Sequence, residues 1–148
     1  MSSSTPLTRP VAAGLFAPPD GAGQLPWLLG SRCQRCGELV FPAMRDCPAC
    51  VSHNSMVSHR LRGRGRVARF VVARHGPQGF VTPYIQAFVQ LDDGPLVYSL
   101  IDGCEPRDDA LEAGQIVEMS ITTVRRDGDI DVIGWKFHPL DARHASHG

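Results

Sequence analysis

Residues 33–50 read CQRCGELVFPAMRDCPAC, and their four cysteines carry the strongest structural signal in the chain. Cys33 and Cys36 are separated by two residues, as are Cys47 and Cys50, and ten residues lie between the two pairs. Two CxxC pairs this close together are typical of a metal site. Each CxxC turn directs two sulfur atoms toward one centre, so two turns complete the tetrahedron that Zn²⁺ prefers. We therefore expect all four cysteines to be metal ligands.

The residues between the two pairs favour a small hairpin, because residues 37–42 form a β arm too short for a helix and its return. Gly37 suits the tight turn after the first pair, since glycine adopts a positive φ at little cost. Pro48 stiffens the second turn. These features predict a zinc ribbon over residues 25–55. Its Zn²⁺ would be structural, because four thiolates leave no open position for catalysis.

Three other interpretations of the cysteines are weaker. Two disulfides would require an oxidising compartment, and a redox-active CxxC pair would be expected next to a βαβ unit, which this sequence lacks. Iron in a rubredoxin-like site uses similar turns, and the spacing does not exclude it.

The composition describes an ordinary globular chain with one modest core. It has 148 residues, of which 43% are hydrophobic and 20% are charged. These values exclude a disordered chain, a collagen and a long coiled coil. The chain is also too short for a fold such as a TIM barrel, which needs about 250 residues. No apolar run approaches the length of a transmembrane helix, so we expect a cytoplasmic protein without membrane contact, whose thiols stay reduced.

The hydrophobic pattern after residue 60 changes to a period of two, which indicates β-strands. Asp93-Gly94 and Asp127-Gly128 mark hairpin turns between such runs. We expect five strands, at residues 67–73, 84–91, 96–101, 115–124 and 130–137. A short helical turn is expected at residues 109–112. Five short antiparallel strands best match an OB-fold barrel. The predicted chain is mainly β, with a loose segment at 1–24, the ribbon at 25–55, the OB-fold at 60–140 and a flexible tail at 141–148.

The charge is neutral overall but divided along the chain. Residues 1–75 hold ten arginines and three acids, whereas residues 76–148 hold five basic and twelve acidic residues. Four of the arginines occupy alternate positions, which would share one face of an extended strand. With one more nearby, the candidate ligand- or partner-binding residues are Arg60, Arg62, Arg64, Arg66 and Arg69. The alternative interpretation is a solvated strand face, paired with the acidic C-terminal half.

Catalytic motifs are absent from the sequence, so we assign no catalytic residue. Cys104 could be read as a nucleophile, but it lies between Asp102 and Glu105. These neighbours would raise the pKa of its thiol and suppress the thiolate. We therefore interpret Cys104 as an ordinary loop or strand-end thiol.

Several motifs outside the cysteines complete a more specific pattern. Leu25-Pro26-Trp27 precedes the first CxxC pair, and Gly63-Arg64-Gly65-Arg66-Val67 follows the second. Pro83-Tyr84 then opens a strand that ends near Leu91-Asp92-Asp93-Gly94. Over about residues 25–139, this combination resembles the DUF35 family, in which a rubredoxin-like zinc ribbon precedes an OB-fold. Family members often have a longer N-terminal helix, which the prolines and glycines of residues 18–26 make implausible here.

The resemblance implies a role beside an enzyme. DUF35 proteins usually accompany a thiolase-superfamily enzyme, which supplies the catalytic residues. We therefore expect a non-catalytic accessory subunit that binds a thiolase-like protein and supports carbon–carbon bond cleavage or formation in an acyl-CoA by thiolysis, acyl transfer or retro-aldol chemistry. A CoA thioester could lie at the shared interface.

The alternative is a single-stranded nucleic-acid-binding module, because zinc ribbons and OB-folds also bind nucleic acids. Aromatic residues are only 7% of the chain, and the region from residue 92 onward, which includes its last three expected strands, holds twelve acids. Both features disfavour base stacking over a basic groove.

Overall fold

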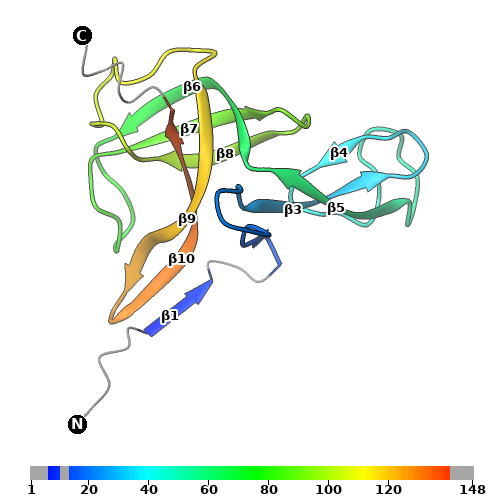
Figure 1. Cartoon of the computed structure of the whole chain (residues 1–148), viewed down its shortest axis with the longest axis horizontal. Helices are drawn as coiled ribbons and strands as arrows, with labels where there is room; N and C mark the ends of the chain where they lie inside the picture. Colours follow the sequence, from blue (N-terminus) through cyan, green and yellow to red (C-terminus); the bar gives the residue numbers. More distant parts are fainter. Residues whose placement is uncertain (1–6, 11–13, 141–148) are drawn as a thin grey trace.

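The structure is a computed structural model that describes residues 7–10 and 14–140, and within these residues it contains strands but no helix. The strands are β1 (Leu7–Pro10), β2 (Phe16–Ala17), β3 (Trp27–Cys33), β4 (Leu39–Val40), β5 (Met56–Arg62), β6 (Arg64–Ala73), β7 (Tyr84–Leu91), β8 (Leu96–Ile101), β9 (Ile116–Asp127) and β10 (Ile130–Pro139). Figure 1 shows two parts, with a ribbon built on β3, β4 and β5 beside a barrel of the later strands.

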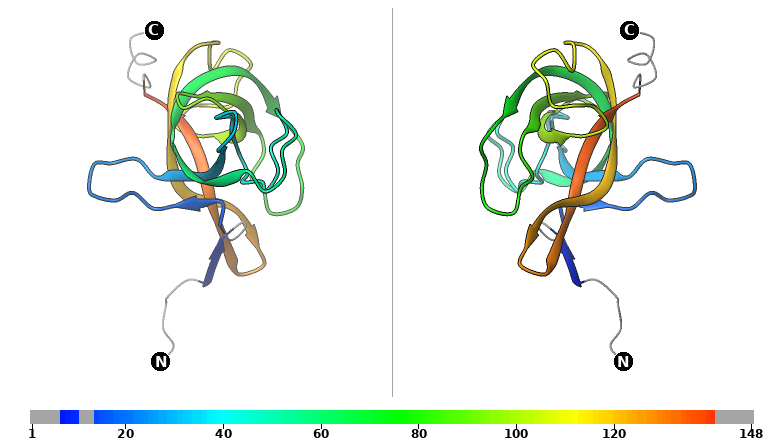
Figure 2. Two further views of the ribbon diagram at one scale, coloured as in Figure 1. Left: turned by 90° about the vertical axis from the view of Figure 1, so that its right-hand side faces the viewer. Right: turned by 90° about the vertical axis from the view of Figure 1, so that its left-hand side faces the viewer.

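The barrel is closed by five strands. β6 pairs with β7, β7 with β8, β8 with β10 in parallel, β10 with β9, and β9 returns to β6. The end-on views of Figure 2 show this ring, with the loop between β2 and β3 projecting to one side. This topology confirms the OB-fold, and closure leaves its five strands without a free edge around the ring. The expected strands match closely, but β6 begins earlier than predicted, at Arg64.

Alternation along the strands fills the barrel. On β7 the side chains of Ile85, Ala87, Val89 and Leu91 are buried, while the residues between them face outward. The same core cluster includes Leu28 and Leu61, which come from the ribbon strands. The ribbon and the barrel therefore share one continuous core, which fixes the orientation of the ribbon on the barrel.

An aromatic cluster adds to this connection. Trp135 of β10 contacts Phe16 of β2, with ring centroids 5.8 Å apart, and Phe41 of the ribbon, with centroids 5.7 Å apart and planes at 81°. Edge-to-face pairs of this kind stabilise beyond the area that they bury. Trp135 thus joins three segments that are distant in the sequence.

Two expectations about irregular segments were wrong. Within the segment expected to be loose at 1–24, β1 pairs in parallel with β10 and β2 pairs with β3, and Arg9 forms an ion pair with Asp127. Residues 130–133 of β10 extend beyond its pairing with β8 and leave an edge to which β1 adds, a long-range pairing that local sequence patterns do not reveal. At 109–112 there is no helical turn but a loop with isolated turn bonds, held by the buried side chain of Leu111.

Two further expectations concern the C-terminal tail and the membrane. The tail at 141–148 lies outside the described residues. Among the residues that are described, none forms a helix long and apolar enough to cross a membrane.

Gly63 separates β5 from β6, where the chain passes from the ribbon into the barrel. A Cβ atom at this position would lie 2.7 Å from the Met119 Cβ and 2.9 Å from the Pro26 carbonyl oxygen. Gly65 has a similar constraint, since its Cβ would lie 2.3 Å from the Gln90 carbonyl oxygen. The lack of a side chain at Gly63 and Gly65 therefore allows neighbouring chain segments to pack closely where the ribbon meets the barrel.

We predict that Gly63→Ala lowers the free energy of unfolding by about 1–3 kcal/mol, because an added methyl group must displace the backbone of Pro26 or the side chain of Met119. Urea denaturation measures this change. Gly21→Ala is the control, since its Cβ would meet only the flexible Gln24 side chain, at 3.7 Å. Equal stability of the two variants would contradict the close approach.

Candidate functional site

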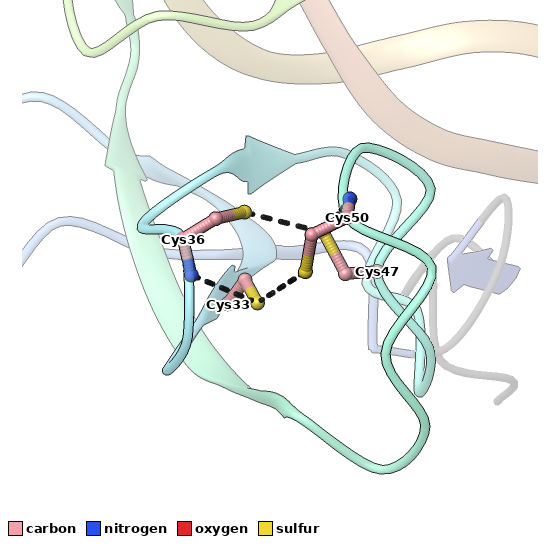
Figure 3. Close-up of side chains that lie close together, drawn as sticks. All are labelled: Cys33, Cys36, Cys47 and Cys50. Carbon is pink, nitrogen blue, oxygen red and sulfur yellow. Dashed lines mark hydrogen bonds between the residues drawn. The ribbon is translucent and has the colours of Figure 1, made fainter.

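The four cysteines come together at the far end of the ribbon (Figure 3). Cys33 ends β3, Cys36 lies in the turn before β4, and Cys47 and Cys50 lie in the loop between β4 and β5. All four sulfur atoms lie within 4.8 Å of one another. The Sγ atoms of Cys33 and Cys50 are 3.7 Å apart, and those of Cys36 and Cys47 are 3.5 Å apart. These thiols are free, since a disulfide would require about 2.05 Å.

The spacing of the sulfur atoms fits a tetrahedral metal site. A metal–sulfur distance of about 2.3 Å in a regular tetrahedron places neighbouring sulfurs about 3.8 Å apart, close to the two contacts above. The donor set is entirely soft sulfur, which suits zinc or iron and not magnesium or calcium. The group predicted from the sequence is therefore assembled and able to hold one metal ion.

The two CxxC turns have the same backbone construction. The Gly37 N–H donates to the Cys33 carbonyl oxygen and the Val51 N–H to that of Cys47, both at 2.9 Å. Gly37 has a φ of 81°, as expected for the turn, and Val51 has a φ of 60°. A β-branched residue in this region is unusual. The positive φ of Val51 could have been anticipated from its position one residue after Cys50, which matches that of Gly37 after Cys36.

Backbone N–H groups point at the sulfur atoms. The N–H groups of Arg35 and Cys36 donate to the Cys33 Sγ at 3.3 and 3.4 Å, and the Cys50 N–H donates to the Cys47 Sγ at 3.4 Å. Hydrogen bonds to a thiolate favour its charged form. The turns thus prepare these sulfurs for metal binding.

Sequence reasoning missed two serines beside the cluster. Ser52 and Ser55 are both buried, and their hydroxyl oxygens lie 3.8 and 3.4 Å from the Cys33 Sγ. Ser55, helped by neighbouring N–H groups, lowers the pKa of Cys33 to about 5. Ser52, which is 3.0 Å from the Cys50 Sγ, lowers the pKa of Cys50. The only sequence signal was their position just after the second CxxC pair.

Cys36 shows the opposite shift. Although the Glu38 backbone favours its thiolate, contact with the Cys47 sulfur and burial raise the pKa of Cys36 to about 12. Four adjacent sulfurs repel one another when they are all charged, so one of them keeps its proton. A divalent cation at the centre would remove this repulsion.

The candidate arginines are divided between the two parts of the molecule. Arg60 and Arg62 lie on β5, and Arg64, Arg66 and Arg69 lie on β6, with Gly63 between the two strands. The four arginines at alternate positions therefore do not lie on one uninterrupted strand, as the sequence pattern had suggested, because the chain changes sheets at Gly63.

Three of these arginines have polar partners within the chain. Arg60 pairs with Asp20 at 3.0 Å and stacks over the Trp27 ring. Arg64 pairs with Asp92 and Glu118, each at 3.5 Å. Arg66 donates to the Gly114 carbonyl oxygen at 3.0 Å. Pairs such as Arg64–Glu118 join the basic and acidic halves of the chain, so part of the positive charge of the first half is neutralised locally.

The other two candidate arginines, Arg62 and Arg69, are more available to a ligand or partner. The Arg69 guanidinium lies 4.9 Å from the centre of the Phe88 ring. Arg62 lines a hollow of about 250 Å³ together with Gln24, Leu25 and Trp27. Among the described residues, neither guanidinium has a carboxylate partner.

Cys104 lies apart from the metal cluster and packs, half-buried, against the barrel core. Burial, with a contribution from Asp102, raises the pKa of its thiol. The thiolate is the reactive form, so Cys104 is poorly suited to act as a nucleophile near neutral pH.

For the metal cluster, we predict that Cys47→Ser weakens metal binding by more than about 100-fold. Losing an outer hydrogen-bond partner of a ligand already costs about 10–100-fold, and losing a ligand costs more. Elemental analysis of the purified protein should give one metal ion per chain for the wild type and Cys104→Ser, and much less for Cys47→Ser. Full occupancy in Cys47→Ser would rule out this ligand set.

For Cys104, the raised pKa predicts slow alkylation at pH 8, with a rate that keeps rising as the pH becomes more alkaline. Iodoacetamide labelling of the metal-loaded protein, followed by peptide mass spectrometry, measures this rate. N-acetylcysteine is the reference thiol. Labelling of Cys104 faster than the reference at pH 8 would indicate an activated nucleophile.

Comparisons with known proteins place this architecture in context. The family model "ChsH2, C-terminal OB-fold domain" matches residues 58–122. The structure resembles that of an "Ltp2-ChsH2(DUF35) aldolase", with a TM-score of 0.60, 29% identity, and coverage of 76% of this chain and 84% of that chain.

Curated relatives extend the match across the ribbon. A "DUF35 domain-containing scaffold protein" of Methanothermobacter thermautotrophicus is 36% identical over 116 residues, covering 76% of this chain and 86% of the relative. "Benzoylsuccinyl-CoA thiolase subunit BbsA" of Thauera aromatica is 32% identical over 128 residues, covering 85% of this chain and 84% of the relative. With a four-cysteine ribbon joined to a closed OB-fold and matches over most of these chains, this protein belongs to the DUF35 family.

Proposed function

We propose that this chain is the non-catalytic accessory subunit of a thiolase-like enzyme, and that the complex cleaves or forms carbon–carbon bonds in an acyl-CoA. The observation that carries the proposal is the similarity to BbsA, a named thiolase subunit, over more than four fifths of both chains. The likeness to an Ltp2-ChsH2(DUF35) aldolase supports it from the structural side. Thiolysis, acyl transfer and retro-aldol cleavage share the need to hold a CoA thioester in a closed site.

The chain's own residues support a non-catalytic role. Cys104 is disfavoured as a nucleophile by its raised pKa. Ser120 lies 3.2 Å from the Nδ1 of His138, but within the described residues no carboxylate is hydrogen-bonded to that imidazole. A Ser–His pair needs such a partner to orient its base. In this proposal the partner therefore supplies the catalytic residues.

The metal in this proposal is Zn²⁺ with a structural role. Four cysteine ligands fill a tetrahedral shell and leave no position for substrate. When bound, the ion would neutralise the clustered thiolates and hold the two CxxC turns together, so that β3 and β5 keep their register. Free thiols at these positions require a reducing environment, which favours the cytoplasm.

A CoA thioester at the shared interface completes the proposal. CoA carries phosphate groups that arginine binds well. Arg64 and Arg66, two of the five candidate arginines, already have partners in the chain. Arg62 is better placed, since its guanidinium has no carboxylate partner among the described residues and lies beside the indole of Trp27 in an open hollow. We propose Arg62 as the phosphate contact on this chain.

Affinity purification of the tagged full-length chain from its native source tests the accessory role. We expect a thiolase-like protein in stoichiometric amount, identified by mass spectrometry, and turnover of a CoA thioester by the recovered complex. Cys104→Ala should recover the same partner with unchanged kcat, because the catalytic groups belong to the partner.

Failure to recover a thiolase-like protein would overturn the proposal. Loss of turnover in the Cys104→Ala complex would instead identify this chain as an enzyme. Within an active complex, Arg62→Ala should raise the KM for the CoA thioester by at least about tenfold, since a charge-assisted hydrogen bond contributes about 1.5–3 kcal/mol. Arg35→Ala, at an exposed turn of the ribbon, is the matched control.

A further inference from the structure

The outer face of β6, β7 and β8 is unusually apolar for a surface of this chain. Its outward residues are Arg66, Arg69, Val71, Gln86, Phe88, Gln90, Leu96, Tyr98 and Leu100, here called the outer β6–β8 face. Val71 is 59% exposed, and Leu96 and Tyr98 are each 49% exposed. Figure 1 shows these three strands side by side, and at the β7–β8 turn the face reaches the ribbon, where Gln90 and Leu96 share a hollow with Leu39 of β4.

The sequence of β8 indicates that this face is covered in the working protein. β8 reads LVYSLI, in which Val97 and Ile101 point into the core while Leu96, Tyr98 and Leu100 point outward. An antiparallel strand with one face in water normally alternates apolar and polar residues. β8 lacks this alternation, and in that respect it resembles a strand that is buried on both faces. Large exposed apolar patches of this kind mark binding surfaces.

Tyr98 lines two hollows, one at the border between this face and β9–β10 and one within the face. One has a volume of about 230 Å³ and is lined by Phe80, Leu100 and Trp135 as well as Tyr98. The other has about 130 Å³ and lies between Tyr98, Phe88 and Val71. Hollows beside an exposed aromatic residue accept side chains from a partner, and such sites concentrate binding energy.

Charge limits the kind of surface that fits here. None of the nine residues of the outer β6–β8 face is acidic, and two are arginines. Arg69 lies over the Phe88 ring and, among the described residues, has no carboxylate partner. A complementary surface would therefore present apolar side chains around at least one carboxylate.

We propose that the outer β6–β8 face is the docking surface for the thiolase-like partner, with apolar partner side chains in the hollows beside Tyr98 and a partner carboxylate on Arg69. This inference rests on the proposed function and adds the location of the contact. Tyr98 and Leu96 supply the central apolar area, and Arg69 supplies orientation and long-range attraction.

Two other occupants fit the face less well. A second copy related by twofold symmetry would place the same face against itself, and this face has no acidic residue to pair with either arginine. Single-stranded nucleic acid would need open aromatic faces for stacking. Here the Arg69 guanidinium covers the Phe88 ring, and the Phe88 and Tyr98 rings pack edge to face, with centroids 6.1 Å apart.

The test measures the affinity of the full-length, metal-loaded chain for its purified thiolase-like partner by biolayer interferometry. We expect Tyr98→Ser and Leu96→Ser each to raise Kd by at least about tenfold, as hot-spot truncations do. Arg69→Glu should slow association and reduce its dependence on salt. Met44→Ser is the matched control, since Met44 is 48% exposed but lies on the ribbon. The Kd of this variant for the partner should stay within about twofold of the wild-type value.

Each result decides the proposal. Wild-type binding that Tyr98→Ser and Leu96→Ser leave unchanged, with folding verified by circular dichroism, would overturn the docking surface while the accessory role stands. An equal loss in Met44→Ser would also overturn it. A wild type without affinity for the partner would overturn both proposals. A homodimer that Tyr98→Ser converts to monomer, or tight binding of a fluorescent oligodeoxythymidylate that Tyr98→Ser abolishes, would assign the face to another occupant.

Discussion

The convergence of four cysteine sulfurs is the constraint on which the ribbon depends. A segment of this size cannot bury enough apolar surface to be stable alone, so small modules of this kind rely on a metal or on a neighbouring core. The sulfurs lie within 4.8 Å of one another, at distances that suit one tetrahedral ion. The opposite pKa shifts of Cys33 and Cys36 reflect the same proximity, because adjacent thiolates repel until a cation lies between them.

The ribbon is not a separate module attached by a linker. Leu28 and Leu61 enter the core of the barrel, and Trp135 packs against Phe41 of the ribbon. Gly63, between β5 and β6, lies so close to Pro26 and Met119 that a side chain at this position would collide with them. The position of the metal end of the ribbon is thus fixed relative to the barrel, as a scaffold that orients a partner requires.

Charge and apolar surface are distributed differently around this rigid frame. The arginines of the sequence stripe are partly neutralised by acids from the C-terminal half, as in Arg64 with Glu118. The outer β6–β8 face instead combines apolar side chains with Arg69, which has no acidic partner among the described residues. A stripe that looks basic in the sequence is therefore a mixture of internal ion pairs and a few available cations, and the available ones lie beside aromatic rings.

Local patterns in the sequence determined the four clustered cysteines, the five barrel strands and the closed β architecture. CxxC spacing, period-two alternation and Asp-Gly turns act over a few residues and do not depend on distant contacts. Tertiary structure alone decided that β1 joins β10, that Ser52 and Ser55 line the sulfur cluster, and that Arg64 has acidic partners while Arg69 has none within residues 7–10 and 14–140. Sequence could not reveal these features, because each depends on residues that only the closure of the barrel and the folding of the ribbon bring together.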